Sequence, residues 1–170
     1  DSIEAALKVA SRIPEEAWRS MPLLQQFLVA PLFAYTRFGK WEEILKEPAP
    51  AQDVQFLRGV WHYARGLAYT ATGRTDDAAR ELDRLQQIAA MDSLKGLQVT
   101  FSRNGARAIL EIAVEVLAGE LAAARVLVAM RVAADEHHAM LLDPLRVVLL
   151  DLVALVGVLD RACGAPPGGG

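Results

Sequence analysis

The sequence predicts an all-α protein, and three observations lead to that prediction. Apolar residues recur at spacings of three and four along most of the chain, as on the buried face of a helix. No stretch alternates β-branched and polar residues between hairpin turns, so strand signals are nearly absent. Glycine and proline divide the chain into segments of roughly 10–20 residues, an ordinary helix length. Hydrophobic residues make up 53% of the 170 residues, enough to form a buried core.

The expected helix ends follow from residues that stop helices. In chain order they lie at Pro14, Pro22, Gly39, residues 47–53 (EPAPAQD), Gly73, residues 91–96 (MDSLKG), residues 102–105 (SRNG) and Pro144. Residues 109–125 form the most regular amphipathic segment, with Glu111, Glu115 and Glu120 away from its apolar stripe. That stripe consists of Leu110, Ala113, Val114, Leu117 and Leu121.

Residues 61–85 form the clearest unit, a helical hairpin. Its first helix (VWHYARGLAYTAT) ends at Gly73, which can adopt the left-handed conformation of a helix cap. We expect Thr75 to cap the second helix, with Asp76 and Asp77 in its first turn, where a helix favours negative charge. The apolar face of the second helix consists of Ala78, Leu82, Leu85 and Ile88 or Ala89. Residues with little side-chain bulk should let helices approach closely here: Gly66, Ala68, Thr75, Ala78 and Ala79.

Part of this hairpin occurs twice in the chain. The stretches AYTRFGK (34–40) and AYTATGR (68–74) place Tyr35 and Tyr69 34 residues apart, and Gly39 and Gly73 keep the same distance. Neither helix of such a hairpin can bury its apolar stripe alone. The repetition therefore predicts stacked hairpins.

The hairpin resembles the tetratricopeptide repeat, a family of 34-residue helical hairpins. The matching positions are Gly66, Ala68, Tyr69, Gly73, Ala78, Leu82 and Leu85. A degenerate copy 34 residues earlier supplies Leu32, Ala34, Tyr35, Gly39, Trp41 and Ile44. That copy departs from the family pattern, since Leu32 replaces a glycine and Ile44 an alanine. Pro31 also interrupts its first helix, and Pro48 shortens its second.

The wider resemblance is to the C-terminal part of long bacterial tetratricopeptide-repeat proteins, and it covers residues 1–125. It divides them into the degenerate copy (about 25–50), the best copy (about 59–91) and a partial copy from about 105, which aligns Gly119 with Gly66. The resemblance implies a right-handed α-solenoid of antiparallel hairpins whose concave groove binds a peptide or another protein. It implies no cofactor. The positions that face the groove in this family register are Phe33, Thr36, Arg37, Tyr63, Leu67 and Thr70.

The resemblance ends at Arg125. Residues 126–170 contain no Lys, Ile, Ser, Thr, Asn, Gln or aromatic residue. Two interpretations stay open: irregular apolar capping helices (126–162) with a flexible Gly/Pro end (163–170), or a non-native frame created by a frameshift in GC-rich DNA. The apolar run 147–159 contains Asp151 and is shorter than the roughly 20 residues of a membrane span. We therefore expect no membrane span, and a buried or partner-seeking helix instead.

No group of residues in the sequence suggests catalysis, so we expect no enzyme. Asp135 and His138 have the spacing of a helical metal pair, but no second cluster completes four ligands, which favours a solvated face and no metal site. His62 could act as a general base, yet no carboxylate or nucleophile stands near it in sequence, so a packing or groove role is expected. Cys163 has no neighbours that would activate a thiolate.

The net charge of −3 is too small to indicate a nucleic-acid partner. The single cysteine leaves the compartment undecided, and the missing initiator Met suggests a fragment or a processed chain. The expected function is a protein-interaction scaffold that binds a protein or peptide in the groove. The alternatives are a helical accessory or oligomerisation domain of a larger enzyme or regulator, and self-association through residues 140–160.

Overall fold

A computed structural model of the chain describes the backbone of residues 2–99 and 104–163, and the side-chain surroundings of residues 2–99 and 104–134. In this part of the chain every regular element is a helix and none is a strand, which confirms the all-α prediction. The chain divides into two compact units, Asp1–Val126 and Leu127–Gly170. The candidate sites described below lie in the first unit.

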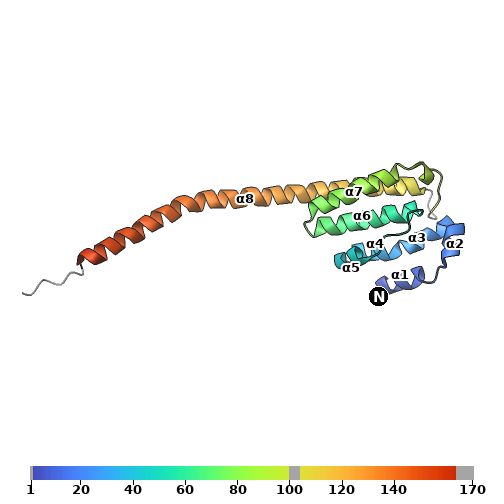
Figure 1. Ribbon diagram of the computed structural model, residues 1–170, viewed down its shortest axis with the longest axis horizontal. Coiled ribbons are helices and arrows are strands. Elements are labelled where there is room, and N and C mark those ends of the chain that lie inside the picture. Colours follow the sequence, from blue (N-terminus) through green and yellow to red (C-terminus); the bar gives the residue numbers. More distant parts are fainter. Residues whose placement is uncertain (1, 100–103, 164–170) are drawn as a thin grey trace, which may run out of the picture. The chain divides into compact units, whose positions relative to one another are not determined.

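The elements follow one another in a simple order (Figure 1). They are α1 (Ser2–Ala10), α2 (Glu15–Ser20), the 3-10 turn η1 (Pro22–Leu24), α3 (Gln25–Leu28), α4 (Ala30–Arg37), α5 (Trp41–Lys46), α6 (Gln55–Ala71), α7 (Thr75–Ala89), the 3-10 turn η2 (Asp92–Leu94) and α8 (Ala106–Cys163). Helices α4 and α5 form one hairpin, and α6 and α7 form a second, longer one.

The turns of these two hairpins have the same backbone geometry. Gly39 and Gly73 both take positive φ, +64° and +77°. In the first turn the Lys40 N–H donates to Tyr35 O at 2.9 Å; in the second, the Arg74 N–H donates to Tyr69 O at 2.8 Å. The glycine N–H donates three residues back in each case, at 3.2 and 3.1 Å. Both turns are therefore Schellman caps, in which a left-handed glycine ends the first helix.

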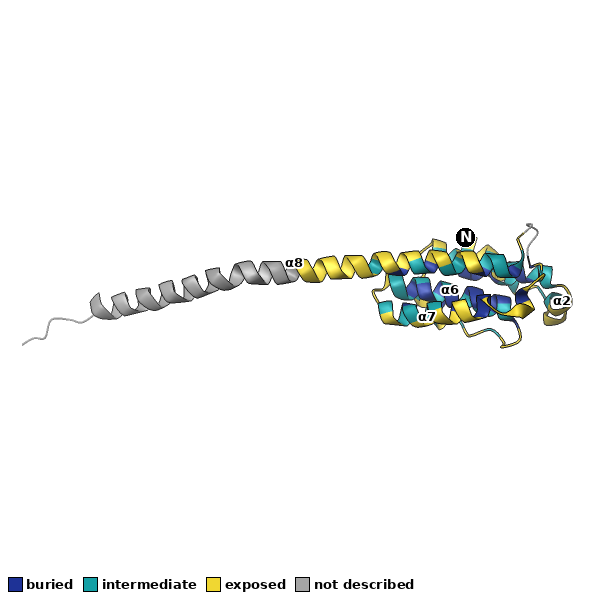
Figure 2. Ribbon diagram, turned by 90° about the horizontal axis from the view of Figure 1, so that it is seen from above, coloured by how far each residue is buried: buried dark blue, intermediate teal, exposed yellow. Residues whose placement is uncertain are grey.

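Helix α6 forms the centre of the core. Figure 2 shows buried residues concentrated along it. The fully buried side chains come from α6 and from the elements around it, and they include Ile44, Phe56, Ala68, Ala78, Leu85, Leu94, Leu110 and Leu117. Every residue of the stripe expected over 109–125 is buried or half-buried, whereas Glu111, Glu115 and Glu120 are exposed, so that prediction is confirmed. The apolar face expected on α7 is likewise turned inward.

Two glycines of α6 allow α8 to approach closely. A Cβ added at Gly59 would lie 2.5 Å from Leu110, and one added at Gly66 would lie 2.4 Å from Leu117. Both leucines are 0% exposed, so their side chains have little room to withdraw. Gly66 therefore serves the packing of α6 against α8.

Three sequence predictions differ from the structure. Helix α7 begins at Thr75, its N-cap is Arg74, and no side chain caps it, so the predicted Thr75 cap is wrong. The reason is the preceding turn, which already places the Arg74 carbonyl to accept the Ala78 N–H at 3.0 Å. Asp76 and Asp77 do lie in the first turn, as predicted. Helix α6 begins at Gln55, five residues before the expected start.

The helix end predicted at Pro144 is also wrong, because α8 continues through it to Cys163. A proline inside a helix costs about 3 kcal/mol. The leucines next to Pro144 (Leu141, Leu142 and Leu145) are strong helix formers and favour a helix on both sides of it. The described backbone of residues 126–162 is accordingly one continuous helix, whereas residues 164–170 of the predicted flexible end lie outside the described part.

Candidate functional site

Three of the six predicted groove residues line one pocket between α4, α6 and α8. The pocket has a volume of about 290 Å³, and its lining residues are Thr36, Trp41, Leu67, Thr70, Ala71 and Glu120. Thr36 comes from α4, Leu67 and Thr70 come from α6, and Glu120 comes from α8. Trp41, a position of the degenerate copy, is half-buried at the start of α5 and forms part of the pocket wall.

The other three predicted groove residues lie outside this pocket on the same helices. Phe33 on α4 is 45% exposed. Arg37 is exposed in the last turn of α4, and within the described residues no carboxylate pairs with it. Tyr63 on α6 is half-buried. We call the set Phe33, Thr36, Arg37, Tyr63, Leu67, Thr70 and Glu120 the α4–α6–α8 face.

The two threonines of the pocket present oxygen lone pairs. Thr36 Oγ1 donates to Leu32 O at 2.8 Å, and Thr70 Oγ1 donates to Gly66 O at 2.9 Å. Each hydroxyl proton is thus used within its own helix, in the same i−4 pattern. The lone pairs can still accept hydrogen bonds, so both side chains suit a ligand that donates N–H groups.

The pKa of Tyr63 responds to its burial and to the nearby Glu120. Burial raises the pKa of the Tyr63 phenol, and the negative charge of Glu120 raises it further. The phenol therefore remains a protonated donor at neutral pH. This side of the α4–α6–α8 face combines a phenol donor with a carboxylate acceptor.

A buried polar network joins α6 to α7. His62 Nδ1 lies 2.6 Å from Glu81 Oε2, and Arg65 Nε donates to Glu81 Oε1 at 2.9 Å. These side chains are only 10–16% exposed. Burial raises the pKa of Glu81, but the hydrogen bonds from His62 and Arg65 lower it more, so the net shift is downward. Glu81 is therefore an ionised acceptor, and His62 Nδ1 carries the proton that it donates.

Arg65 ties this network to the neighbouring hairpin. Its guanidinium lies 4.5 Å from the Trp61 ring centroid and donates to Tyr69 Oη at 2.7 Å. It also donates to Leu45 O at 3.2 Å, and Trp61 Nε1 donates to Glu47 O at 3.0 Å. Sequence reasoning missed Glu81 because it stands 19 residues from His62 and meets it only when α6 and α7 pair. The signal that could have found it is the inward-facing carboxylate among the apolar residues of α7.

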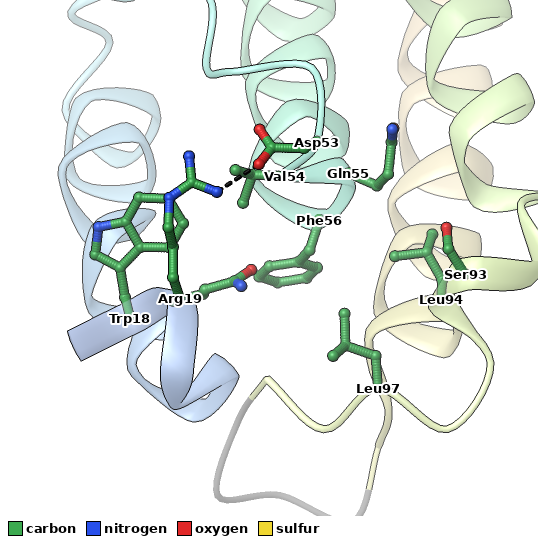
Figure 3. Close-up of a pocket in the computed structure, with 10 residues that line it drawn as sticks. Trp18, Arg19, Asp53, Val54, Gln55, Phe56, Ser93, Leu94 and Leu97 are labelled. Carbon is green, nitrogen blue, oxygen red and sulfur yellow. Dashed lines mark hydrogen bonds and ion pairs between the residues drawn. The ribbon is translucent and has the colours of Figure 1, made fainter. Parts of the chain in front are cut away.

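A further pocket lies between α2, α6 and η2 (Figure 3). Its volume is about 170 Å³, and Arg19 and Asp53 form an ion pair at its edge, across from Phe56, Leu94 and Leu97. Gln25 also lines it, and the Gln25 Oε1 atom is buried with no partner among the described residues. The Gln25 carbonyl oxygen is therefore a hydrogen-bond acceptor without a protein partner in the described part of the chain at this pocket.

Other residues considered in the sequence lie beyond this region. The side chains of residues 135–138 and of Cys163 fall outside the described side chains. In the part of the chain where side chains are described, no group of three or more His, Cys, Asp or Glu could hold a metal ion. No helix within the described residues is long and apolar enough to cross a bilayer.

Comparison with known proteins adds no relative. The chain matches no protein-family model, no curated protein and no solved structure.

Proposed function

We propose that the first unit is part of a tetratricopeptide-like array of helical hairpins, and that its α4–α6–α8 face binds an extended segment of a partner protein. The observation that carries the proposal is the pocket that brings Thr36, Leu67 and Thr70 together with Glu120. These residues come from three helices far apart in sequence, so the pocket is a feature of stacked hairpins and not of one hairpin alone.

The matching turns support the array. Hairpins α4–α5 and α6–α7 repeat the same Schellman cap at an offset of 34 residues. Thr36 and Thr70, which are also 34 residues apart, each donate a hydrogen bond to the carbonyl four residues earlier. In the proposed array, α4 and α6 are equivalent helices and α8 is the third. The groove of such an array is lined by these equivalent helices.

The outer side of α8 also fits an array that continues. Ile112 and Val116 are 57% and 43% exposed, and a Cβ at Gly119 would meet nothing within 4 Å. Gly119 is the residue that the family register aligns with Gly66, whose small size lets α8 pack onto α6. A further helix packed on α8 in the same way would cover Ile112 and Val116.

The chemistry of the face indicates an extended peptide with both polar backbone contacts and a large side chain. Thr36 and Thr70 can accept peptide N–H groups, and Tyr63 can donate to a peptide carbonyl. Phe33 offers an exposed ring as an anchor for an apolar side chain. Glu120 and Arg37 carry opposite charges and would fix the direction of the bound segment.

The proposal is tested by selecting peptides from a displayed library and measuring their affinity by fluorescence anisotropy. Substitution Glu120→Lys should weaken a selected peptide about tenfold or more. Glu115→Lys is the matched control, because Glu115 is on the same helix but lines a different pocket, next to α7. Equal loss in both variants, or loss in neither, contradicts the proposed site.

A further inference from the structure

We propose that a second, basic pocket between α6 and α7 binds a small phosphate-type oxyanion. The pocket has a volume of about 230 Å³. Its polar lining consists of Gln52, Gln55, Arg58, His62, Arg84 and Gln87, and Ile88 and Met91 complete it. It shares no residue with the α4–α6–α8 face, so the inference does not depend on the proposed function.

The lining of this pocket carries positive charge and includes no carboxylate. Five arginines form ion pairs with carboxylates in the described residues: Arg19, Arg65, Arg74, Arg80 and Arg107. Arg58 and Arg84 form none there, although both line one pocket, and no Asp or Glu is among its lining residues. Two arginines that line one pocket whose lining holds no carboxylate create a favourable position for an anion.

Arg58 and Arg84 each have N–H donors that make no hydrogen bond within the described residues. Arg58 donates one N–H to Pro50 O at 3.0 Å, and Arg84 donates one to Gln87 Oε1 at 3.3 Å. A guanidinium carries five N–H donors, so each can still bind an oxyanion. The bond to Gln87 Oε1 also leaves the amide group of Gln87 as a further donor.

His62 gives the pocket a buried polar wall. It is 8% exposed, and its Nδ1–H is held by the ionised Glu81 carboxylate. Nε2 is therefore the ring nitrogen left for the pocket, and it can accept a hydrogen bond from a P–OH group or donate one when the ring is charged. A carboxylate ligand has no such hydroxyl when ionised, which favours phosphate over carboxylate.

The size of the pocket suits a single small group. Pockets for drug-sized ligands usually exceed about 300 Å³. The helix dipoles contribute little to anion binding in this pocket. The N-terminus of α6 and the C-terminus of α7 lie at the same end of the hairpin, so their opposite partial charges offset each other. The specificity rests on the donors contributed by Arg58, His62 and Arg84 from two helices.

The test is an NMR titration of the full chain with inorganic phosphate at constant ionic strength, set with potassium chloride. The His62 Cε1–Hε1 signal, assigned with a His62→Gln variant, should shift saturably. Arg84→Gln should weaken binding at least tenfold. Arg80→Gln, which removes the same charge from an exposed site on the same helix, should change the affinity less than twofold.

Two additional ligands sharpen the result. Methyl phosphate binding more tightly than inorganic phosphate identifies a phosphomonoester as the ligand, and equal binding identifies free phosphate. Acetate should bind at least tenfold more weakly than either. The inference is overturned if no His62 signal saturates, if acetate binds as tightly as phosphate, or if Arg80→Gln weakens binding as much as Arg84→Gln does.

Discussion

The two hairpins of the first unit share a turn and differ in almost everything else. Their caps at Gly39 and Gly73 have matching φ angles and hydrogen bonds. Helices α4 and α5 have 8 and 6 residues, whereas α6 and α7 have 17 and 15. The turn is therefore encoded locally, by a glycine and the residues beside it, while helix length and interior depend on the rest of the sequence.

The interiors differ most in their polar groups. The second hairpin contains the network of His62, Arg65 and Glu81. The residues 34 positions before His62 and Arg65 are Leu28 and Pro31, which have no side-chain donors. Pro31 lies in the first turn of α4, where a helix tolerates proline. The equivalent positions of the first hairpin therefore have no counterpart of the buried charged network, which is found only in the second hairpin among the described residues.

The largest effect is expected from removing the network. Substitution Glu81→Ala leaves Arg65 and His62 without their carboxylate in a nearly buried setting, and should lower the free energy of unfolding by about 3 kcal/mol. Urea unfolding followed by circular dichroism measures it. Asp83→Ala, at an exposed position of the same helix, should change stability by less than about 0.5 kcal/mol. Similar losses in both variants would show that the network of His62, Arg65 and Glu81 adds no measurable stability to the folded protein.

A methyl group at Gly66 should produce the next largest effect. In Gly66→Ala the new Cβ meets the buried Leu117 side chain at 2.4 Å, so we expect a loss of about 2 kcal/mol from overpacking between α6 and α8. Combining it with Leu117→Ala, which removes the colliding atoms, should make the two losses less than additive. Full additivity in urea unfolding would contradict this contact.

The pH dependence of stability should separate Glu81 from the other carboxylates. Its pKa in the folded protein is below the unfolded value of about 4.3, so its stabilising effect is complete above that value and is lost as the pH falls through the folded pKa. Wild type should exceed Glu81→Gln by about 1.5 kcal/mol at pH 7, and the difference should shrink below pH 4.3. A difference that grows on acidification would contradict the assigned charge state.

The turns provide the direct test of equivalence between the hairpins. Gly39→Ala and Gly73→Ala each force a side chain into the left-handed region, and each should cost about 1 kcal/mol. The space around both glycines is adequate, with the nearest contact 3.7 Å away at Gly39 and none within 4 Å at Gly73. Costs that differ by more than about 1 kcal/mol in urea unfolding would show that the turns are not equivalent.

The smallest effect expected is a stabilisation. Gly119 lies inside α8 with open space around it, so Gly119→Ala should raise stability by about 0.8 kcal/mol through helix propensity alone. Differential scanning calorimetry would detect it as a higher Tm. A decrease in Tm for the isolated chain would contradict the open space around Gly119.

Local signals explain which features could be predicted from the sequence. The cap glycines and the apolar stripe that includes Leu110 and Leu117 depend on neighbours within a few residues, and both are found as expected. Glu81 could not be paired with His62, because that contact depends on the register between α6 and α7. Helix α8 continues past Pro144, so this proline does not mark a helix end. A single proline is not a sufficient sign of a helix end, because the residues around it contribute their own helix propensities.

The candidate site was predictable only in part, for the same reason. The family register supplied Thr36, Leu67 and Thr70, which do line one pocket. It did not supply Glu120, since its place depends on how α8 packs onto the glycines of α6. Contacts between distant helices thus complete a site whose separate parts are visible in the sequence.

Peptide binding at the α4–α6–α8 face can be measured directly by mapping the amide chemical-shift changes that a selected peptide causes. We expect the largest shifts on this face, at Thr36, Leu67, Thr70 and Glu120. Shifts confined to α7, or absent from this face, would contradict it.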